Sequence, residues 1–251
     1  MYDFEIQKNM LDAANCLLDK KEILNVSALG GGTALSAYYW NHRYSTDIDI
    51  FVHSKDDISM MLRPKEWDSV FLDKLNNLGY DGNCKVYPVY TEIVIQDDYK
   101  IQFFSVEDKT QDPYKIVDLW GTKIQIESIQ EIIAKKIYYR AHKGNARDLF
   151  DIAIAIHKNP LIFSELQVQI EKFKELFETV SKIKENQELS REYIWEIELM
   201  NPNENYSLLA VNTIAYLFVF LENYCGAYDL GIELAQSEYI LIEESAYTIV
   251  K

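Results

Sequence analysis

The segment from residue 28 to residue 52 constrains this chain more than any other, because two polar signals stand close together in it. Its second half, DIDIFV at residues 47–52, alternates acidic and apolar residues. Successive side chains of a β-strand point to opposite faces, so a period of two predicts a strand. Asp47 and Asp49 are then expected on one face, with the isoleucines turned into a core.

Two carboxylates side by side repel each other and lose hydration unless a cation lies between them. Mg²⁺ suits such a place, because it takes oxygen ligands, retains waters and is commonly shared with substrate phosphates. Asp47 and Asp49 are therefore predicted ligands of Mg²⁺ or Mn²⁺. The plainer interpretation of the same pattern is a pair of solvated carboxylates at the end of a strand.

The first half of the segment contains three consecutive glycines, at residues 30–32. A glycine-rich turn that opens a helix presents backbone N–H groups and the positive end of the helix dipole to an anion. Alone, such a turn indicates only a strand-to-helix connection. The nearby carboxylates favour a site for a nucleoside triphosphate (NTP). The residues predicted to hold its phosphates are Gly31, Gly32 and Thr33, with Arg43 and Ser45 just before the first Asp.

A second group of candidate residues lies in KKIYYRAHKGNARDLFD, residues 135–151. Five Lys or Arg fall within residues 135–147 with no acid among them, in a chain of net charge −15. Lys136, Arg140 and Lys143 follow helical spacing and are expected on one helix face. Lys136 and Lys143, together with Arg43, would neutralise the charge of the triphosphate and of the leaving pyrophosphate. A plainer interpretation is that basic residues in the last turn of a helix complement its dipole. This interpretation explains the positions of Arg140 and Lys143, but it explains Arg147-Asp148, at the start of the next helix, less well.

Both stretches resemble motifs of one family. The first resembles the signature of the nucleotidyltransferase (polymerase-beta-like) superfamily and is most similar to its AbiEii/AbiGii-type toxin branch, GGTxL…R-x-S-x-DID. The second resembles that branch's second motif, a Lys followed by R/K-x-x-x-RD-x-x-D. The matching positions are Gly31, Gly32, Thr33, Leu35, Arg43, Ser45, Asp47, Ile48 and Asp49, then Lys136, Lys143, Arg147, Asp148 and Asp151.

The resemblance implies a metal-dependent nucleotidyltransferase that transfers a nucleotide from an NTP to tRNA or to a protein. It further implies the toxin of a toxin–antitoxin or abortive-infection pair, with an antitoxin protein as partner. An alternative stays open, a nucleotide-binding module that has lost transfer chemistry and acts through a partner. The implied catalytic residues are Asp47, Asp49, Lys136 and Asp148, and the implied nucleotide-binding residues are Gly31, Gly32, Thr33, Arg43, Ser45, Lys143 and Arg147.

Many members of the superfamily carry a third metal carboxylate on a later strand. The best-placed strand here, residues 99–104, has Gln102 at its inward polar position, and a neutral amide is a poorer ligand for Mg²⁺. Either the site is degraded, which favours the binding module, or another acid assists. Asp148 is the candidate, and a helix-start carboxylate that pairs with Arg147 is its plainer interpretation.

The remaining pattern predicts an α+β fold. Helices are expected at residues 2–21 and 64–77, and strands at 26–29, 84–96, 99–106, 116–120 and 122–126, with a hairpin turn at 97–98 and a surface connection at 54–63. A capping box at Ser128 indicates the start of a helix at 128–143. Further helices are expected at 145–157, at 164–184 and in several segments between 191 and 247. We expect a mixed-sheet nucleotidyltransferase core in residues 1–126 and a helical domain in residues 127–251, packed on that core.

Composition restricts the partners. With 25 Lys or Arg against 40 Asp or Glu, the chain is a poor generic nucleic-acid binder, because such binding rests on phosphate neutralisation. Any RNA contact needs a local basic patch. The sequence shows no apolar run of membrane-spanning length and no signal-peptide pattern, and its three cysteines are widely spaced. These features predict a cytoplasmic protein without a membrane partner.

Overall fold

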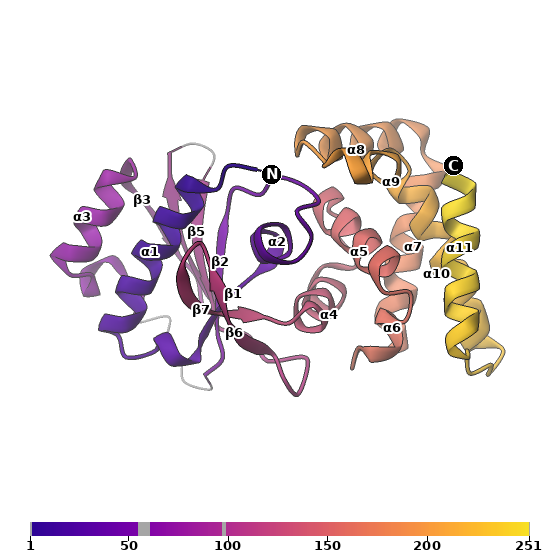
Figure 1. The fold of residues 1–251 in the computed structure, drawn as a ribbon, viewed down its shortest axis with the longest axis horizontal. Coiled ribbons are helices and arrows are strands. Elements are labelled where there is room, and N and C mark those ends of the chain that lie inside the picture. Colours follow the sequence, from indigo (N-terminus) through magenta and orange to yellow (C-terminus); the bar gives the residue numbers. More distant parts are fainter. Residues whose placement is uncertain (1, 55–60, 97–98, 251) are drawn as a thin grey trace. The chain divides into compact units, whose positions relative to one another are not determined.

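The computed structural model describes residues 2–54, 61–96 and 99–250, with side chains described up to residue 248. Contacts between Cα atoms divide the chain into two compact units, residues 1–128 and 129–251. The first unit holds a seven-stranded mixed sheet with helices, and the elements described in the second unit are helices (Figure 1). The fold is therefore α+β, as predicted.

The sheet has the strand order β3-β4-β5-β2-β1-β7-β6. β2 runs parallel to β5 and β1 runs parallel to β7, whereas the other neighbours are antiparallel. The two strands that carry the predicted site, β1 and β2, thus lie near the middle of the sheet. The strands are β1 (Ser27–Gly30), β2 (Ile48–Val52), β3 (Tyr80–Val86), β4 (Tyr90–Ile95), β5 (Tyr99–Phe104), β6 (Tyr114–Leu119) and β7 (Thr122–Glu127).

Helices α1 (Glu5–Lys20) and α3 (Ser69–Asn77) pack against each other, and α1 contacts β2 and β5 (Figure 1). Ile48, Ile50 and Val52 of β2 face a core on this side and are at most 1% exposed, whereas Phe51 shares the other side of the strand with Asp49. Asp49 alternates with the isoleucines and is only half-buried. The strand predicted from the period of two is therefore confirmed, and its acidic side lies opposite the isoleucines.

β1 runs directly into α2 (Gly31–Ala34), which continues as a π-helical segment over Leu35–Trp40. Gly31 has φ +64°, a left-handed conformation that glycine adopts without strain. Asn41 ends the π-helical segment with φ +50°. The chain then returns through residues 42–47 to β2, which brings the glycine turn and the acidic strand together.

Several predicted elements are wrong in detail. The helix predicted at 164–184 is two helices, α6 (Ile162–Glu165) and α7 (Ile170–Glu185), with residues 166–169 between them outside any helix. Residues 84–96 form parts of two strands, because the chain turns at residues 87–89 between β3 and β4. Pro88 lies in that turn, where its missing N–H breaks no strand pairing. The helix predicted from Pro64 is only a 3₁₀ turn at first, and α3 starts after Asp68, whose carboxylate accepts the N–H of Phe71 at 2.8 Å. The hairpin turn predicted at 97–98 and most of the connection predicted at 54–63 lie outside the described residues.

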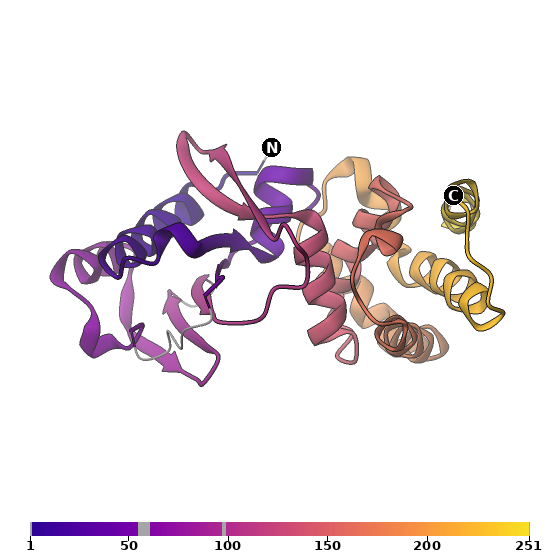
Figure 2. The same ribbon diagram turned by 90° about the horizontal axis from the view of Figure 1, so that it is seen from below.

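The second unit is built around α10 (Thr213–Asp229), which contacts α5, α7 and α11. Its Tyr216, Leu217, Phe220 and Leu221 are fully buried. After α10 the chain turns back into α11 (Figure 2). The other helices are α4 (Ile129–Arg140), α5 (Ala146–Lys158), α6 (Ile162–Glu165), α7 (Ile170–Glu185), α8 (Gln187–Leu199), α9 (Ser207–Val211) and α11 (Gln236–Val250).

Within the described ranges, no single helix has both the length and the apolar character needed to cross a membrane. One pair, Glu204–Val211 and Thr213–Asp229, passes the two criteria together but is bent by 67°. The second member of the pair is α10, whose large side chains fill the core of its own unit.

Candidate functional site

A row of polar side chains crosses the sheet on the face opposite α1, and we call this side the polar face. Asp49 on β2 is the direct partner of Gly30 on β1 and of Gln102 on β5. Gln102 in turn pairs with Glu92 on β4, and Glu92 with Lys85 on β3. Residues directly opposite each other on neighbouring strands share a face, so the four side chains from Lys85 to Asp49 form one row.

Gln102 lies beside Asp49, at the position where a third metal-binding carboxylate would be expected. Its Nε2 donates to Oε2 of Glu92 at 2.8 Å. Lys85 and Lys100 hold the same carboxylate, with Nζ–O distances of 3.4 and 3.6 Å. A carboxylate accepts but does not donate, so the NH₂ group of Gln102 faces Glu92. The polar face thus has a neutral amide next to Asp49, with the acid one strand farther away.

The carboxylate of Asp49 lies against the glycine turn. A Cβ built on Gly31 would come closer than 3.0 Å to Oδ2 of Asp49, a separation that real Cβ atoms essentially never show. The φ of +64° is a second obstacle to any side chain at this position. Position 31 therefore requires glycine for two independent reasons, and the turn fits directly onto the acidic strand.

Arg43 lies over the next glycine in the same way. A Cβ on Gly32 would approach Nη2 of Arg43 closer than 3.0 Å and would lie 3.3 Å from Oγ of Ser45. Nη1 of Arg43 donates to the Tyr44 carbonyl at 3.0 Å, and Arg43 is only 3% exposed. A positively charged group is thereby fixed next to the first turn of α2.

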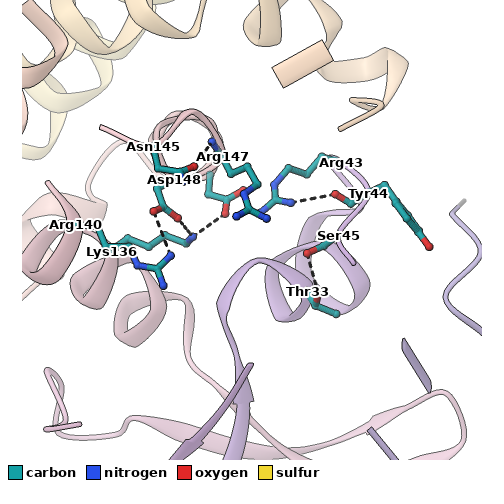
Figure 3. A network of polar contacts seen from close by, with 10 residues as sticks. Thr33, Arg43, Tyr44, Ser45, Lys136, Arg140, Asn145, Arg147 and Asp148 are labelled. Carbon is teal, nitrogen blue, oxygen red and sulfur yellow. Dashed lines mark hydrogen bonds and ion pairs between the residues drawn. The ribbon is translucent and has the colours of Figure 1, made fainter. Parts of the chain in front are cut away.

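Hydrogen bonds attach the loop that precedes β2 to this turn (Figure 3). Oγ1 of Thr33 lies 2.9 Å from Oγ of Ser45 and also contacts the carbonyl oxygen of Asp47. Gln7 of α1 donates through Nε2 to the Ser45 carbonyl at 2.8 Å. Thr33 is completely buried. Thr33 was predicted from the sequence to hold phosphate, but its hydroxyl holds the loop that carries Arg43, Ser45 and Asp47.

Asp47 directly precedes β2, which begins at Ile48. Carboxylate oxygens such as those of Asp47 and Asp49 are the donors that Mg²⁺ prefers. The carboxylate of Asp49 lies over Gly31, and the guanidinium of Arg43 lies over Gly32. No group of three or more His, Cys, Asp or Glu suited to a metal ion occurs among the described residues. By their chemistry, the carboxylates of Asp47 and Asp49 suit an ion that takes its remaining ligands from water and substrate.

Lys136 forms a buried ion-pair cluster in the second unit (Figure 3). Its Nζ contacts Oδ1 of Asp148 and lies 3.0 Å from Oδ2 of Asp151, and Nη1 of Arg140 lies 3.4 Å from Oδ2 of Asp148. Lys136, Asp148 and Asp151 are 7%, 5% and 0% exposed. Burial alone would raise the pKa of Asp148, but the charges of Lys136 and Arg140 outweigh burial and lower it. Lys136 is therefore held between two carboxylates.

The prediction that three basic residues share one helix face is wrong for Lys143. α4 ends at Arg140, and residues 141–143 form a turn before Gly144, which has φ +55°. Asn145 then caps α5, since its Oδ1 accepts the N–H of Arg147 at 3.0 Å. Lys143 thus lies in the turn after α4, and Gly144 and the N-cap residue Asn145 separate Arg147 from the helix that carries Lys136.

Glu127 is a residue that sequence reasoning missed. It ends β7, and the pairing of Leu29 with Ile126 places it beside Gly30. Glu127 is 0% exposed, and its Oε2 would come closer than 3.0 Å to a Cβ on Gly30. Nε2 of His53 lies 3.5 Å from Oε1 of Glu127. Only the parallel register of β1 and β7 brings Glu127 next to the turn, and no local pattern signals it.

Comparison with known proteins agrees with the first motif. Residues 17–78 match the family model described as "Nucleotidyl transferase AbiEii toxin, Type IV TA system". This segment contains the glycine turn and both carboxylates, so the resemblance predicted from the sequence is confirmed there. No curated protein matches the chain.

Two solved structures from Helicobacter pylori are similar to the chain. The crystal structure of JHP933 is 17% identical and covers 89% of this chain and 95% of its own, with a TM-score of 0.45. A structure described as a "putative nucleotidyltransferase" is 16% identical and covers 88% of this chain and 96% of its own, with a TM-score of 0.46.

Proposed function

We propose that this chain, whose residues 17–78 match the AbiEii nucleotidyltransferase family, is a metal-dependent enzyme. It transfers a nucleotide from an NTP to an acceptor, which is an RNA such as tRNA or a protein. The observation that carries the proposal is the direct fit of Asp49 against Gly31. This contact supports the proposal because a carboxylate that can bind a cation lies beside backbone N–H groups that can bind phosphate, a combination suited to in-line displacement at phosphorus.

In this proposal, residues of the first unit bind the metal ion and the phosphates of the NTP. Asp47 and Asp49 hold Mg²⁺ or Mn²⁺, an ion that neutralises phosphate charge and favours ionisation of the acceptor hydroxyl when bound. Gly31, Gly32 and Thr33 offer backbone N–H groups to the terminal phosphates. Arg43 supplies a fixed positive charge for the leaving pyrophosphate, and Ser45 positions this loop through Thr33.

The residues of the second motif take their roles from the family resemblance. Lys136 stabilises phosphate charge, and Asp148 orients Lys136 through their buried contact. A carboxyl group with a lowered pKa remains ionised near neutral pH and is a weak proton acceptor, so we assign Asp148 to orientation rather than to general base catalysis. Lys143 lies in the turn before α5, and Arg147 lies in the first turn of α5. We assign both residues to contact with the nucleotide.

The family description names a toxin of a type IV toxin–antitoxin system. We extend that role to this chain, with an antitoxin protein as its partner and the cytoplasm, where NTPs and tRNA are found, as its place of action.

The neutral Gln102 beside Asp49 favours the alternative, a nucleotide-binding module without transfer chemistry. One assay separates the two functions. The purified chain is incubated with each α-labelled NTP, Mg²⁺, total RNA and cell protein. Label that appears on RNA or protein supports the enzyme. An NTP-dependent rise in melting temperature without transfer supports the module, and the absence of both results contradicts any nucleotide function.

A further inference from the structure

The C-terminal part of the second unit combines one-sided charge with exposed apolar side chains. Residues 192–250 contain ten Asp or Glu and no Lys or Arg, although the whole chain has 25 basic residues. Single exposed apolar residues are ordinary in globular proteins. Here several large ones occur together with the acids, and they are Trp195, Leu199, Leu208, Val211, Tyr228, Leu230, Ile232, Ile240 and Leu241.

Part of this set lines a groove between α10 and α11, which we call the α10–α11 groove. Its volume is about 470 Å³. Leu230, Ile232 and Leu241 in its walls are 77%, 49% and 61% exposed. The complete lining is Glu222, Asn223, Gly226, Ala227, Leu230, Ile232, Leu234, Glu238, Leu241 and Ile242.

Small residues keep the groove open on the α10 side. A Cβ built on Gly226 would meet no atom within 4 Å, so space lies directly over this glycine. Gly in the interior of a helix lowers helix stability relative to Ala. The open space, together with exposed leucine and isoleucine walls, is suited to an inserted aliphatic side chain.

The charge of the groove selects among occupants. The lining contains two acids, Glu222 and Glu238, and no basic residue. Among the described residues Glu222 has no ion-pair partner, so its charge is available to a ligand. Nucleic acid and anionic lipid would be repelled, and so would the same acidic face of a second copy. A cationic, partly aliphatic protein surface is the complementary occupant.

We propose that the α10–α11 groove binds a basic amphipathic helix of another protein. Aliphatic side chains of that helix enter the space over Gly226 and contact Leu230 and Leu241. Its Lys or Arg side chains pair with Glu222 and Glu238, the two acids of the groove lining. An amphipathic helix in an apolar groove is a common mode of peptide recognition, and the charges set its orientation.

The test uses the full chain and a labelled synthetic peptide of about 18 residues, with Leu on one helical face and Lys on the other. Fluorescence anisotropy gives its affinity. A scrambled peptide of the same composition and a peptide with Glu in place of Lys are the comparison ligands. We expect the basic amphipathic peptide to bind at least about tenfold more tightly than either, and more weakly as salt is added.

Matched variants test whether the peptide binds in the α10–α11 groove. Gly226→Leu fills the open space, and because Leu is the better helix former, the melting temperature should stay equal or rise. Glu222→Lys reverses a charge on the groove, whereas Glu185→Lys makes the same change in net charge at the end of α7. We expect Gly226→Leu and Glu222→Lys each to weaken binding about tenfold and Glu185→Lys to leave it unchanged.

Several results would overturn the proposal. Equal binding of the scrambled peptide, or equal effects of Glu222→Lys and Glu185→Lys, would show attraction by net charge alone. Unchanged affinity in a folded Gly226→Leu variant would remove the groove from the interaction. If that variant fails to fold, the two charge reversals decide. A dimer in light scattering that Gly226→Leu dissociates would identify a second copy as the occupant.

Discussion

The carboxylate of Asp49 occupies the space that a side chain on Gly31 would need. The contact follows from the antiparallel pairing of Asp49 with Gly30, together with the left-handed conformation of Gly31 immediately after it. The turn and the acidic strand therefore cannot change independently, and a substitution in one is expected to disturb the other.

Gly31→Ala tests this relationship, with Gly121→Ala as the matched control. Both glycines have positive φ, +64° and +80°, so both alanines meet backbone strain of about 1–2 kcal/mol. A Cβ at Gly121 meets no atom within 4 Å, whereas one at Gly31 displaces Asp49. Denaturant unfolding should show a larger loss for Gly31→Ala. The Mg²⁺-dependent thermal shift with NTP should disappear only in that variant, and equal behaviour of the two variants would contradict the contact.

Thr33→Val tests the attachment of the loop. The buried hydroxyl of Thr33 contacts Ser45 and the carbonyl of Asp47, so an isosteric methyl group leaves buried acceptors unsatisfied. The free energy of unfolding should fall by about 1–3 kcal/mol. Ser45→Ala removes one of these partners and should cost less. A Thr33→Val protein of unchanged stability would show that the hydroxyl does not hold the loop.

Lys136→Met tests the buried ion-pair cluster. The substitution removes the ammonium group of Lys136 and leaves the buried carboxylates of Asp148 and Asp151 with less compensating charge. The free energy of unfolding should therefore fall by about 3–5 kcal/mol. The double variant Lys136→Met/Asp151→Asn should recover part of the loss, because it removes one of the uncompensated carboxylates. If the single variant is as stable as the wild type, Lys136 does not stabilise the fold. Any loss of activity would then reflect a role of Lys136 in catalysis only.

The same cluster predicts a pH dependence. The pKa of Asp148 is lowered in the folded chain from an ordinary value of 3.8. Its contribution to stability is therefore fully present above that value and is lost as the pH falls through the folded pKa. Urea unfolding should show the wild type more stable than Asp148→Asn at about pH 7, with a difference that shrinks below about pH 4. A difference that grows on acidification would contradict the assignment.

The parts of the site that sequence could predict are those fixed by local pattern. The alternation in residues 47–52 indicated β2 because it depends only on neighbouring residues, and the glycines before Thr33 indicated a turn for the same reason. Gln102 was placed beside Asp49 by its position in a later strand, and the strand register agrees.

The parts that sequence could not predict depend on long-range pairing. Glu127 comes next to Gly30 only through the parallel register of β1 and β7. The enclosure of Lys136 by Asp148 and Asp151 depends on how α4 packs on α5, which helical spacing does not encode. Lys143 was misplaced because spacing alone did not show that α4 ends three residues earlier, before Gly144 adopts a left-handed conformation.

The central claim, nucleotidyl transfer at a site built from Asp47, Asp49 and the glycine turn, is tested most directly by the position of the label. Parallel reactions contain an NTP labelled at the α- or the γ-phosphate, with Mg²⁺ and total RNA and protein. The proposal predicts that α-label becomes attached to an acceptor, that γ-label is released as pyrophosphate, and that a folded Asp47→Asn/Asp49→Asn variant does neither. Transfer of γ-label to the acceptor, or full α-label transfer by the double variant, would contradict it.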